Sequence, residues 1–117
     1  MRYPAILTMV AALCACGTGE VPLKPLTQEQ SAALRPADPR IAQLYVDSCK
    51  ACHTVRDSLA PLAGDRTAWD SRWVQGEAAL LSAVLQGKKA MPAGGQCFTC
   101  TPDDYRALIR FMAGREK

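Results

Sequence analysis

Residues 49–53, Cys-Lys-Ala-Cys-His, constrain the fold of this 117-residue chain more than any other stretch. On a helix, side chains three positions apart share one face, so the thiols of Cys49 and Cys52 would point the same way, with His53 directly after them. Proteins use paired thiols of this kind in structural zinc sites, in redox dithiols and in covalent cofactor attachment. The rest of the sequence separates these three uses.

The histidine count argues against structural zinc. Such a site takes four protein ligands, and with one histidine in the chain zinc would need all four cysteines beyond the N-terminal region: Cys49, Cys52, Cys97 and Cys100. A thioredoxin-like dithiol opens a helix that follows a strand, whereas this pair closes a helical pattern. C-x-x-C-H is instead typical of c-type haem attachment. We therefore expect Cys49 and Cys52 to hold one haem c covalently and His53 to bind its iron.

The second axial ligand of that iron has to be a residue other than histidine, because the chain has no second one. Met91 lies in a glycine-rich stretch, residues 87–95, and is followed by Pro92. A glycine-rich loop can approach a flat cofactor closely, and a proline fixes the backbone beside the ligand. Met9 belongs to the N-terminal region and Met112 to the apolar face of the last expected helix. We therefore expect Met91 to bind the iron, and a thioether ligand raises the reduction potential.

A second cysteine pair, Cys97 and Cys100, is followed by Thr101 rather than by histidine, so it does not form a second haem attachment site. We expect these two cysteines to form a disulfide that stiffens the Met91 loop. Closing so short a loop stabilises the fold by only about 2 kcal/mol. A redox-active dithiol is the alternative.

Helix signals run through residues 38–117 and no convincing strand pattern appears. Asp38 followed by Pro39, and Thr101 followed by Pro102, are typical N-caps with a proline in the first turn. Two shorter helical patterns between them are separated by Gly76. The sequence predicts an all-α domain of about four helices.

The pattern of the N-terminal residues indicates a targeting signal rather than a part of the folded domain. Arg2 and the apolar run 5–13 predict a signal peptide over residues 1–15, because the run is too short to span a bilayer. The following "LCAC" resembles a bacterial lipoprotein box, in which Cys16 would carry acyl chains; an ordinary signal peptide and a soluble periplasmic protein are the alternative. In residues 16–37 the apolar residues follow no sustained helical or strand period. We therefore expect this segment to be a flexible tether that spans roughly 25 Å.

The stretch from residue 38 to 114 resembles the small class I cytochromes c of the cytochrome c5 type. The resemblance rests on "CKACH", on "AP" and "GD" within residues 60–65, on "AW" at 68–69, on Gly76 and on "AMPAGGQCFTCTPDDYRALIRFM". The Met-Pro loop that leads into a C-x-x-C and then a capped helix is its distinctive part.

The resemblance implies a class I cytochrome c fold, about four helices wrapped around one covalently bound haem, and three further site residues. Pro61 matches the proline whose carbonyl accepts a hydrogen bond from Nδ1 of the haem histidine. Trp69 and Arg72 match positions beside the haem propionates, where a guanidinium can pair with a carboxylate.

These expectations describe a one-electron carrier that is not itself an enzyme. Its partners would be redox proteins such as a quinol–cytochrome c oxidoreductase and a terminal oxidase or reductase, on the periplasmic side of a bacterial envelope. Lys88 and Lys89, beside the Met91 loop, either steer an acidic partner or are simply solvated. The formal net charge of +3 predicts no nucleic-acid binding. Two alternatives stay open: a haem sensor or peroxidase-like protein in which Met91 leaves the iron, and a haem subunit of a larger oxidoreductase complex.

Overall fold

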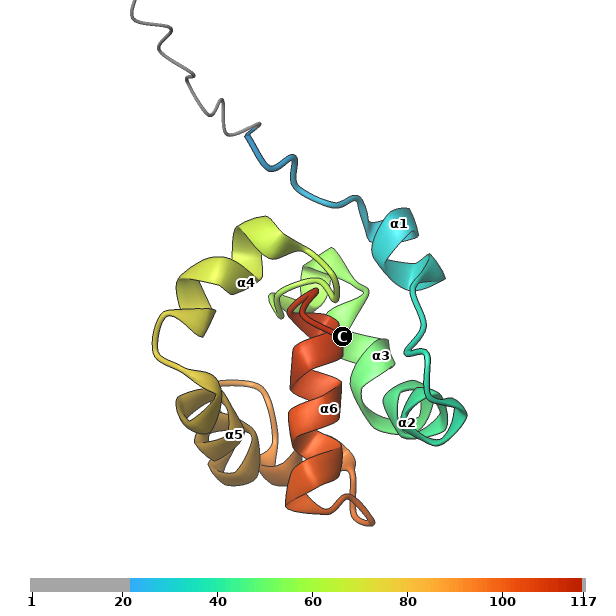
Figure 1. The fold of residues 1–117 in the computed structure, drawn as a ribbon, viewed down its shortest axis with the longest axis vertical. Helices are drawn as coiled ribbons and strands as arrows, with labels where there is room; N and C mark the ends of the chain where they lie inside the picture. The colour runs from blue at the N-terminus through green and yellow to red at the C-terminus, as the bar shows by residue number, and fades with distance from the viewer. Residues whose placement is uncertain (1–21, 117) are drawn as a thin grey trace, which may run out of the picture.

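The computed structural model describes residues 22–116, and helices are the only regular elements within them (Figure 1). The single β-type pairing in this part of the chain is an isolated bridge between Lys88 and Met91. The predicted all-α class is therefore confirmed. The expected signal peptide, residues 1–15, and the expected lipidation site Cys16 lie outside the described residues. None of the helices between residues 22 and 116 is both long enough and apolar enough to cross a bilayer.

The helix that carries the Cys-His motif is built from three consecutive pieces. It comprises α2 (Pro39–Leu44), a π-helical turn η1 (Tyr45–Cys49) and α3 (Lys50–His53). As expected, Asp38 caps its N-terminus, and its carboxylate accepts the backbone N–H groups of Arg40 at 2.8 Å and Ile41 at 3.1 Å. The π turn was not expected from the sequence, and such turns occur frequently at functional sites.

The other main helices follow the predicted pattern closely. They are α4 (Arg66–Trp73), α5 (Glu77–Gln86) and α6 (Pro102–Met112), with two short 3₁₀ turns, η2 (Arg56–Ser58) and η3 (Ala93–Gln96). Thr101 and Asp104 form a capping box at the start of α6, which satisfies two backbone N–H groups. A glycine at position 76 with φ of 86° separates α4 from α5.

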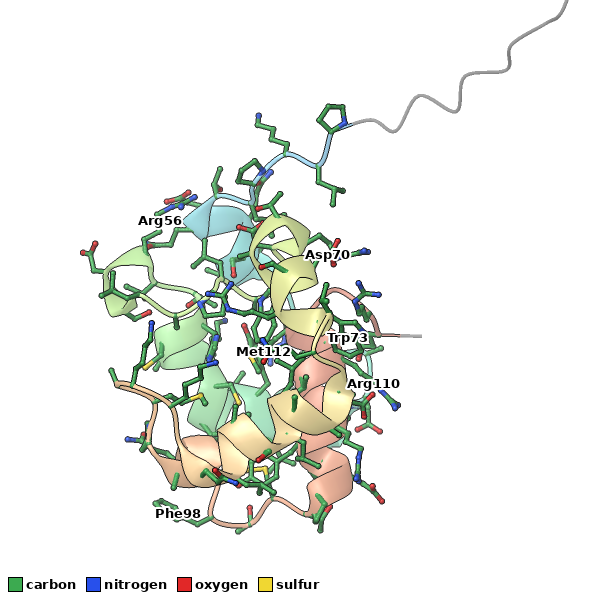
Figure 2. All side chains as sticks on the ribbon, turned by 90° about the vertical axis from the view of Figure 1, so that its left-hand side faces the viewer. Arg56, Asp70, Trp73, Phe98, Arg110 and Met112 are labelled. Carbon is green, nitrogen blue, oxygen red and sulfur yellow. A yellow bond between two sulfur atoms is a disulfide. The ribbon has the colours of Figure 1, made fainter. Side chains whose placement is uncertain are left out.

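Helix α6 is the common packing partner of the fold, with α2 and α3 on one side of it and α4 and α5 on the other (Figure 1). On the α2 side, the Tyr45 ring packs edge-on against Phe111, with 4.8 Å between ring centroids. On the α5 side, Leu81, Tyr105 and Ile109 form a second buried cluster. Met112 is buried in the core, in the interior of the molecule in Figure 2, so the expectation that it packs in the core is confirmed.

Part of the predicted tether is folded, and the prediction of a flexible segment through residue 37 is wrong there. Helix α1 (Gln28–Ala33) lies within it, with a capping box between Thr27 and Gln30 at its start. Its Ser31 is fully buried against the domain. A six-residue helix shows no apolar period, so only the T-x-x-Q capping signal could have revealed it.

Candidate haem-binding site

His53 closes α3, and its ring is held in one orientation. Its Nδ1 lies 2.8 Å from the carbonyl oxygen of Pro61, the contact that the resemblance implies. A carbonyl only accepts, so Nδ1 carries the proton and Nε2 keeps its lone pair. Burial lowers the pKa of His53, against the opposing effect of the Pro61 hydrogen bond, and the charge of Arg72 lowers this pKa further. At neutral pH the ring is therefore the neutral imidazole that a metal needs.

The backbone around Pro61 is fixed from both sides. Ala63 donates its N–H to the His53 carbonyl at 2.6 Å. Trp69 reaches from α4 and donates its indole N–H to the Leu62 carbonyl at 2.8 Å. The Trp69 ring also lies 5.8 Å from the His53 ring, centroid to centroid. Trp69 therefore positions the carbonyl segment that orients His53, a role that the resemblance to propionate-site tryptophans did not indicate.

Cys49 and Cys52 are both free thiols, one helical turn apart. Cys49 is half-buried and Cys52 is exposed. Burial raises the pKa of the Cys49 thiol, with a smaller opposite effect of its hydrogen bond to Ser48. Each sulfur is thus free to form a thioether, and the two lie on the same helix as the histidine.

Met91 sits in a tight turn. Lys88 and Met91 exchange two backbone hydrogen bonds of 3.0 Å. Gly87, with φ of 81°, lies so close to the returning chain that a Cβ there would come 2.9 Å from the Ala93 backbone nitrogen. The loop therefore needs glycine at 87, and it presents the half-buried Met91 side chain between charged Lys88 and rigid Pro92.

The end of this loop is fixed twice, by a disulfide within it and by a hydrogen-bonded contact with α6. Cys97 and Cys100 form a disulfide directly before the helix. The Tyr105 hydroxyl lies 3.0 Å from the Gly94 carbonyl oxygen and 2.9 Å from that of Cys97, and it donates its one proton between them. By its spacing Tyr105 belongs to the apolar face of α6, and the sequence pattern gives no signal for the role of its hydroxyl.

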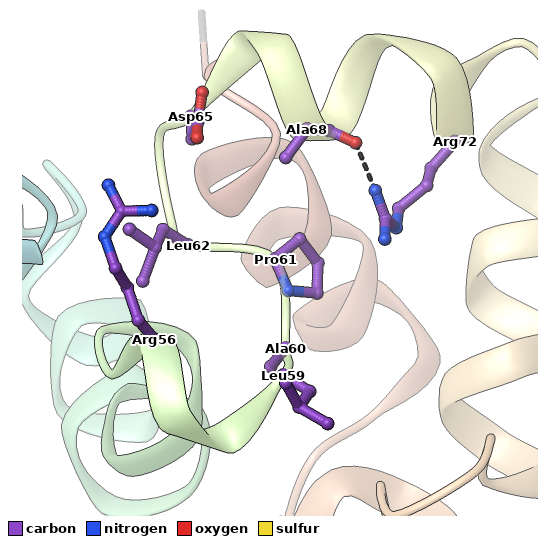
Figure 3. A pocket seen from close by; sticks show the side chains of 8 residues that line it. All are labelled: Arg56, Leu59, Ala60, Pro61, Leu62, Asp65, Ala68 and Arg72. Atoms are coloured by element: carbon purple, nitrogen blue, oxygen red, sulfur yellow. Dashed lines mark hydrogen bonds between the residues drawn. The ribbon is translucent and has the colours of Figure 1, made fainter. Parts of the chain in front are cut away.

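Arg72 lies on α4 beside Pro61, and its guanidinium donates to the Ala68 carbonyl of its own helix. Arg72 and Arg56 lie on opposite sides of Pro61 (Figure 3). The pocket between them has a volume of about 250 Å³ and is lined by Arg56, Leu59, Ala60, Pro61, Leu62, Asp65, Ala68 and Arg72. Arg72 thus contributes positive charge next to the segment that orients His53.

The zinc alternative does not fit this arrangement. Between residues 22 and 116 no three His, Cys, Asp or Glu side chains are grouped so that they could hold a metal ion. Two of the four cysteines that zinc would need are joined to each other, Cys97 to Cys100. One neutral imidazole with two free thiols on its own helix is, by contrast, the donor set of c-type haem attachment. The residues present fit haem c.

Comparisons with known proteins point to the same class of protein. Residues 36–112 match the family model described as cytochrome c oxidase, cbb3-type, subunit III. Cytochrome c5 from Azotobacter vinelandii is 40% identical over 68 residues, which cover 56% of this chain and 82% of the relative. Cytochrome c5 from Ectopseudomonas mendocina is 37% identical over 82 residues, 68% of this chain and 90% of the relative.

A solved structure shares the fold as well. It comes from a crystal structure of an electron-transfer complex of nitrite reductase with cytochrome c, and its matching chain has 36% sequence identity and a TM-score of 0.59. The match covers 68% of this chain and 98% of that one. From the donor set, the fold and these relatives together, this chain belongs to the class I c-type cytochromes of the cytochrome c5 type, monohaem electron carriers with covalently bound haem c.

Proposed function

We propose that Cys49 and Cys52 attach the haem and that His53 and Met91 are its axial ligands. The observation that carries this proposal is the hydrogen bond of His53 Nδ1 to Pro61, which leaves Nε2 free at a buried site. The haem supplies a one-electron iron couple, and the protein supplies its position and environment.

The residues around the site would set the reduction potential in opposite directions. The Pro61 hydrogen bond makes the His53 imidazole a stronger donor, which favours ferric iron. The thioether of Met91 favours ferrous iron. His53 itself is buried, with the Trp69 ring 5.8 Å from it, centroid to centroid.

Two fastenings of the Met91 loop support a carrier rather than an enzyme. The disulfide closes the end of the loop just before α6, and the Tyr105 hydroxyl bonds that end to α6. A methionine held in this way would stay bound to the haem iron, which would leave no site for a substrate there and restrict the haem to one-electron transfer.

The proposed partners are larger redox proteins, with a quinol–cytochrome c oxidoreductase as donor and a terminal oxidase or reductase as acceptor. The solved neighbour, a cytochrome c in complex with nitrite reductase, supports a partner of this class. Lys88 and Lys89 are exposed beside the Met91 turn, where they would speed association with an acidic surface.

We place the protein on the periplasmic side of a bacterial envelope. The signal peptide expected over residues 1–15 supports export, and the lipoprotein-like "LCAC" supports acylation at Cys16.

The axial ligands are tested by the ferric absorption spectrum of the matured protein. We expect the long-wavelength band of methionine-to-iron ligation in the wild type, and its loss in Met91→Leu. Met112→Leu is the matched control and should keep the band. If the wild type lacks the band at neutral pH and binds carbon monoxide readily, Met91 is not a ligand, and a sensor or peroxidase-like function is favoured.

A further inference from the structure

The segment of residues 26–34, here called the α1 segment, precedes the region that matches the family model, residues 36–112. It nevertheless contacts the loop that orients His53. That loop runs from His53 to Ala63 and contains Pro61, the acceptor for the His53 ring. Two of the contacts lie on this loop, and a third lies directly after it.

The first point is Ser31, which is fully buried. Its Oγ lies 2.8 Å from the Ala63 carbonyl oxygen and 3.3 Å from that of His53. Since Ala63 also donates its N–H to the His53 carbonyl at 2.6 Å, the hydroxyl joins the two ends of the loop where they meet. The position of Pro61, two residues before Ala63, depends on this closure.

The second point is on the body of the loop. The side-chain carbonyl of Gln28 accepts the Arg56 backbone N–H at 2.9 Å. The Arg56 guanidinium in turn donates to the Leu26 carbonyl at 2.8 Å. These contacts fix the first half of the loop to the α1 segment.

The third point is Gly64, directly after the loop. Leu34 of the α1 segment packs where a Cβ of residue 64 would be, and such a Cβ would collide with the Leu34 Cδ1. Gly64 also donates its N–H to the Met112 carbonyl at 2.7 Å, so this point is anchored to α6. The α1 segment is thus packed against a fixed part of the core.

We infer that Ser31 is a positioning residue for His53, through which the α1 segment holds the Pro61 carbonyl against the imidazole. This inference rests on the proposed function of His53 as an iron ligand. When the closure loosens, the Pro61 hydrogen bond weakens and the imidazole becomes a poorer donor to ferric iron. Loss of the Ser31 hydroxyl therefore raises the reduction potential.

The test compares Ser31→Ala with the wild type in the full-length, haem-loaded protein. We expect a higher reduction potential, a shifted resonance of the His53 ring N–H proton, and exchange of the Ala63 amide faster by about tenfold, as loss of one hydrogen bond implies. Ser71→Ala is the matched control, because Ser71 is exposed and its Oγ lies 3.4 Å from a carbonyl of its own helix. It should change none of the three readouts.

A Ser31→Ala protein with unchanged potential and unchanged His53 resonance overturns the inference, even if its melting temperature falls, because Ser31 would then be structural only. If this variant does not accumulate, Gln28→Ala removes the second contact from a more accessible position. It should raise the potential by less and speed exchange of the Arg56 amide; an unchanged potential again contradicts the inference. A wild type without covalent haem contradicts the proposed function instead, and Ala63 amide exchange still reports on the closure.

Discussion

His53 Nδ1 lies 2.8 Å from the Pro61 carbonyl oxygen. This hydrogen bond joins the imidazole at the end of α3 to a backbone carbonyl eight positions further along the chain. The hydrogen bond selects the tautomer with a free Nε2. Backbone and side-chain contacts from Ala63, Trp69 and Ser31 hold the acceptor segment in place. The orientation and protonation of His53, the proposed iron ligand, are therefore set by residues from α1 and α4 as well as by its own helix.

Trp69→Phe should destabilise the protein by about 1 kcal/mol, because it removes the indole hydrogen bond to the Leu62 carbonyl, which keeps only the Asp65 N–H at 3.1 Å. Urea unfolding followed by circular dichroism measures the loss. Trp73→Phe is the comparison, since Trp73 is only half-buried and its ring packs against Arg115. Equal losses in the two variants would show that the indole hydrogen bond contributes nothing of its own.

Tyr105→Phe should weaken the attachment of the Met91 loop to α6. It removes the hydroxyl that bonds to Gly94 and Cys97 and should cost about 1 kcal/mol. We expect the methionine-to-iron band to disappear at a lower urea concentration than in the wild type. Phe98→Ala changes a residue that is 95% exposed in the same disulfide loop and should leave the midpoint unchanged. A wild-type midpoint in Tyr105→Phe would mean that the disulfide alone holds the loop.

Much of this arrangement could be predicted because its signals are local. The N-caps at Asp38 and Thr101 lie beside the helices they start, and the five residues 49–53 carry thiols and imidazole in one short run. Ser31 could not be recognised in the same way, since its partners lie 22 and 32 positions away and a serine in a polar segment has no distinctive pattern.

The roles of Tyr105 and of the π turn also depend on tertiary structure. The Tyr105 hydroxyl acts on carbonyls that reach it only after the loop folds onto α6. The π turn, Tyr45–Cys49, inserts a residue into a helix whose sequence reads as ordinary α-helix. Neither feature has a local sequence signal.

Gly64→Ala should be more destabilising than Gly76→Ala. Both glycines have positive φ, +80° and +86°, so both substitutions carry backbone strain of roughly 1–2 kcal/mol. Only at position 64 would the added Cβ also collide with Leu34, whereas nothing lies within 4 Å at position 76. The difference between the two unfolding free energies therefore measures the packing of the α1 segment. Identical losses would mean that the Leu34 side chain gives way at no cost, so that its packing on position 64 adds nothing to stability.

Acid unfolding should depend on the ion pair between Arg40 and Asp104, which joins α2 to α6. The Arg40 hydrogen bond, with those from Thr101, lowers the pKa of Asp104 from 3.8 to about 2. Because the folded-state pKa lies below the unfolded one, this stabilisation is present above about pH 4 and is lost as the pH falls to about 2.

Asp104→Asn should therefore lower the free energy of unfolding at neutral pH. As the pH then falls through that acid window, the variant should lose less stability than the wild type does. Asp103→Asn is the control, because the Asp103 side chain is 93% exposed and its pair with Arg106 lies on the surface. Unfolding free energies at several pH values give both curves. If the unfolding free energy of Asp104→Asn depends on pH as that of the wild type does, the ion pair does not contribute to acid unfolding.

Intact-mass measurement of the mature protein, made in cells with a c-type maturation system, tests the central claim most directly. We predict a mass increased by one haem that survives denaturation, and loss of this increase when Cys49 and Cys52 are both changed to alanine. The Cys97→Ser, Cys100→Ser double variant should keep the added haem. A wild-type protein with no haem in its denatured mass would contradict covalent attachment at Cys49 and Cys52.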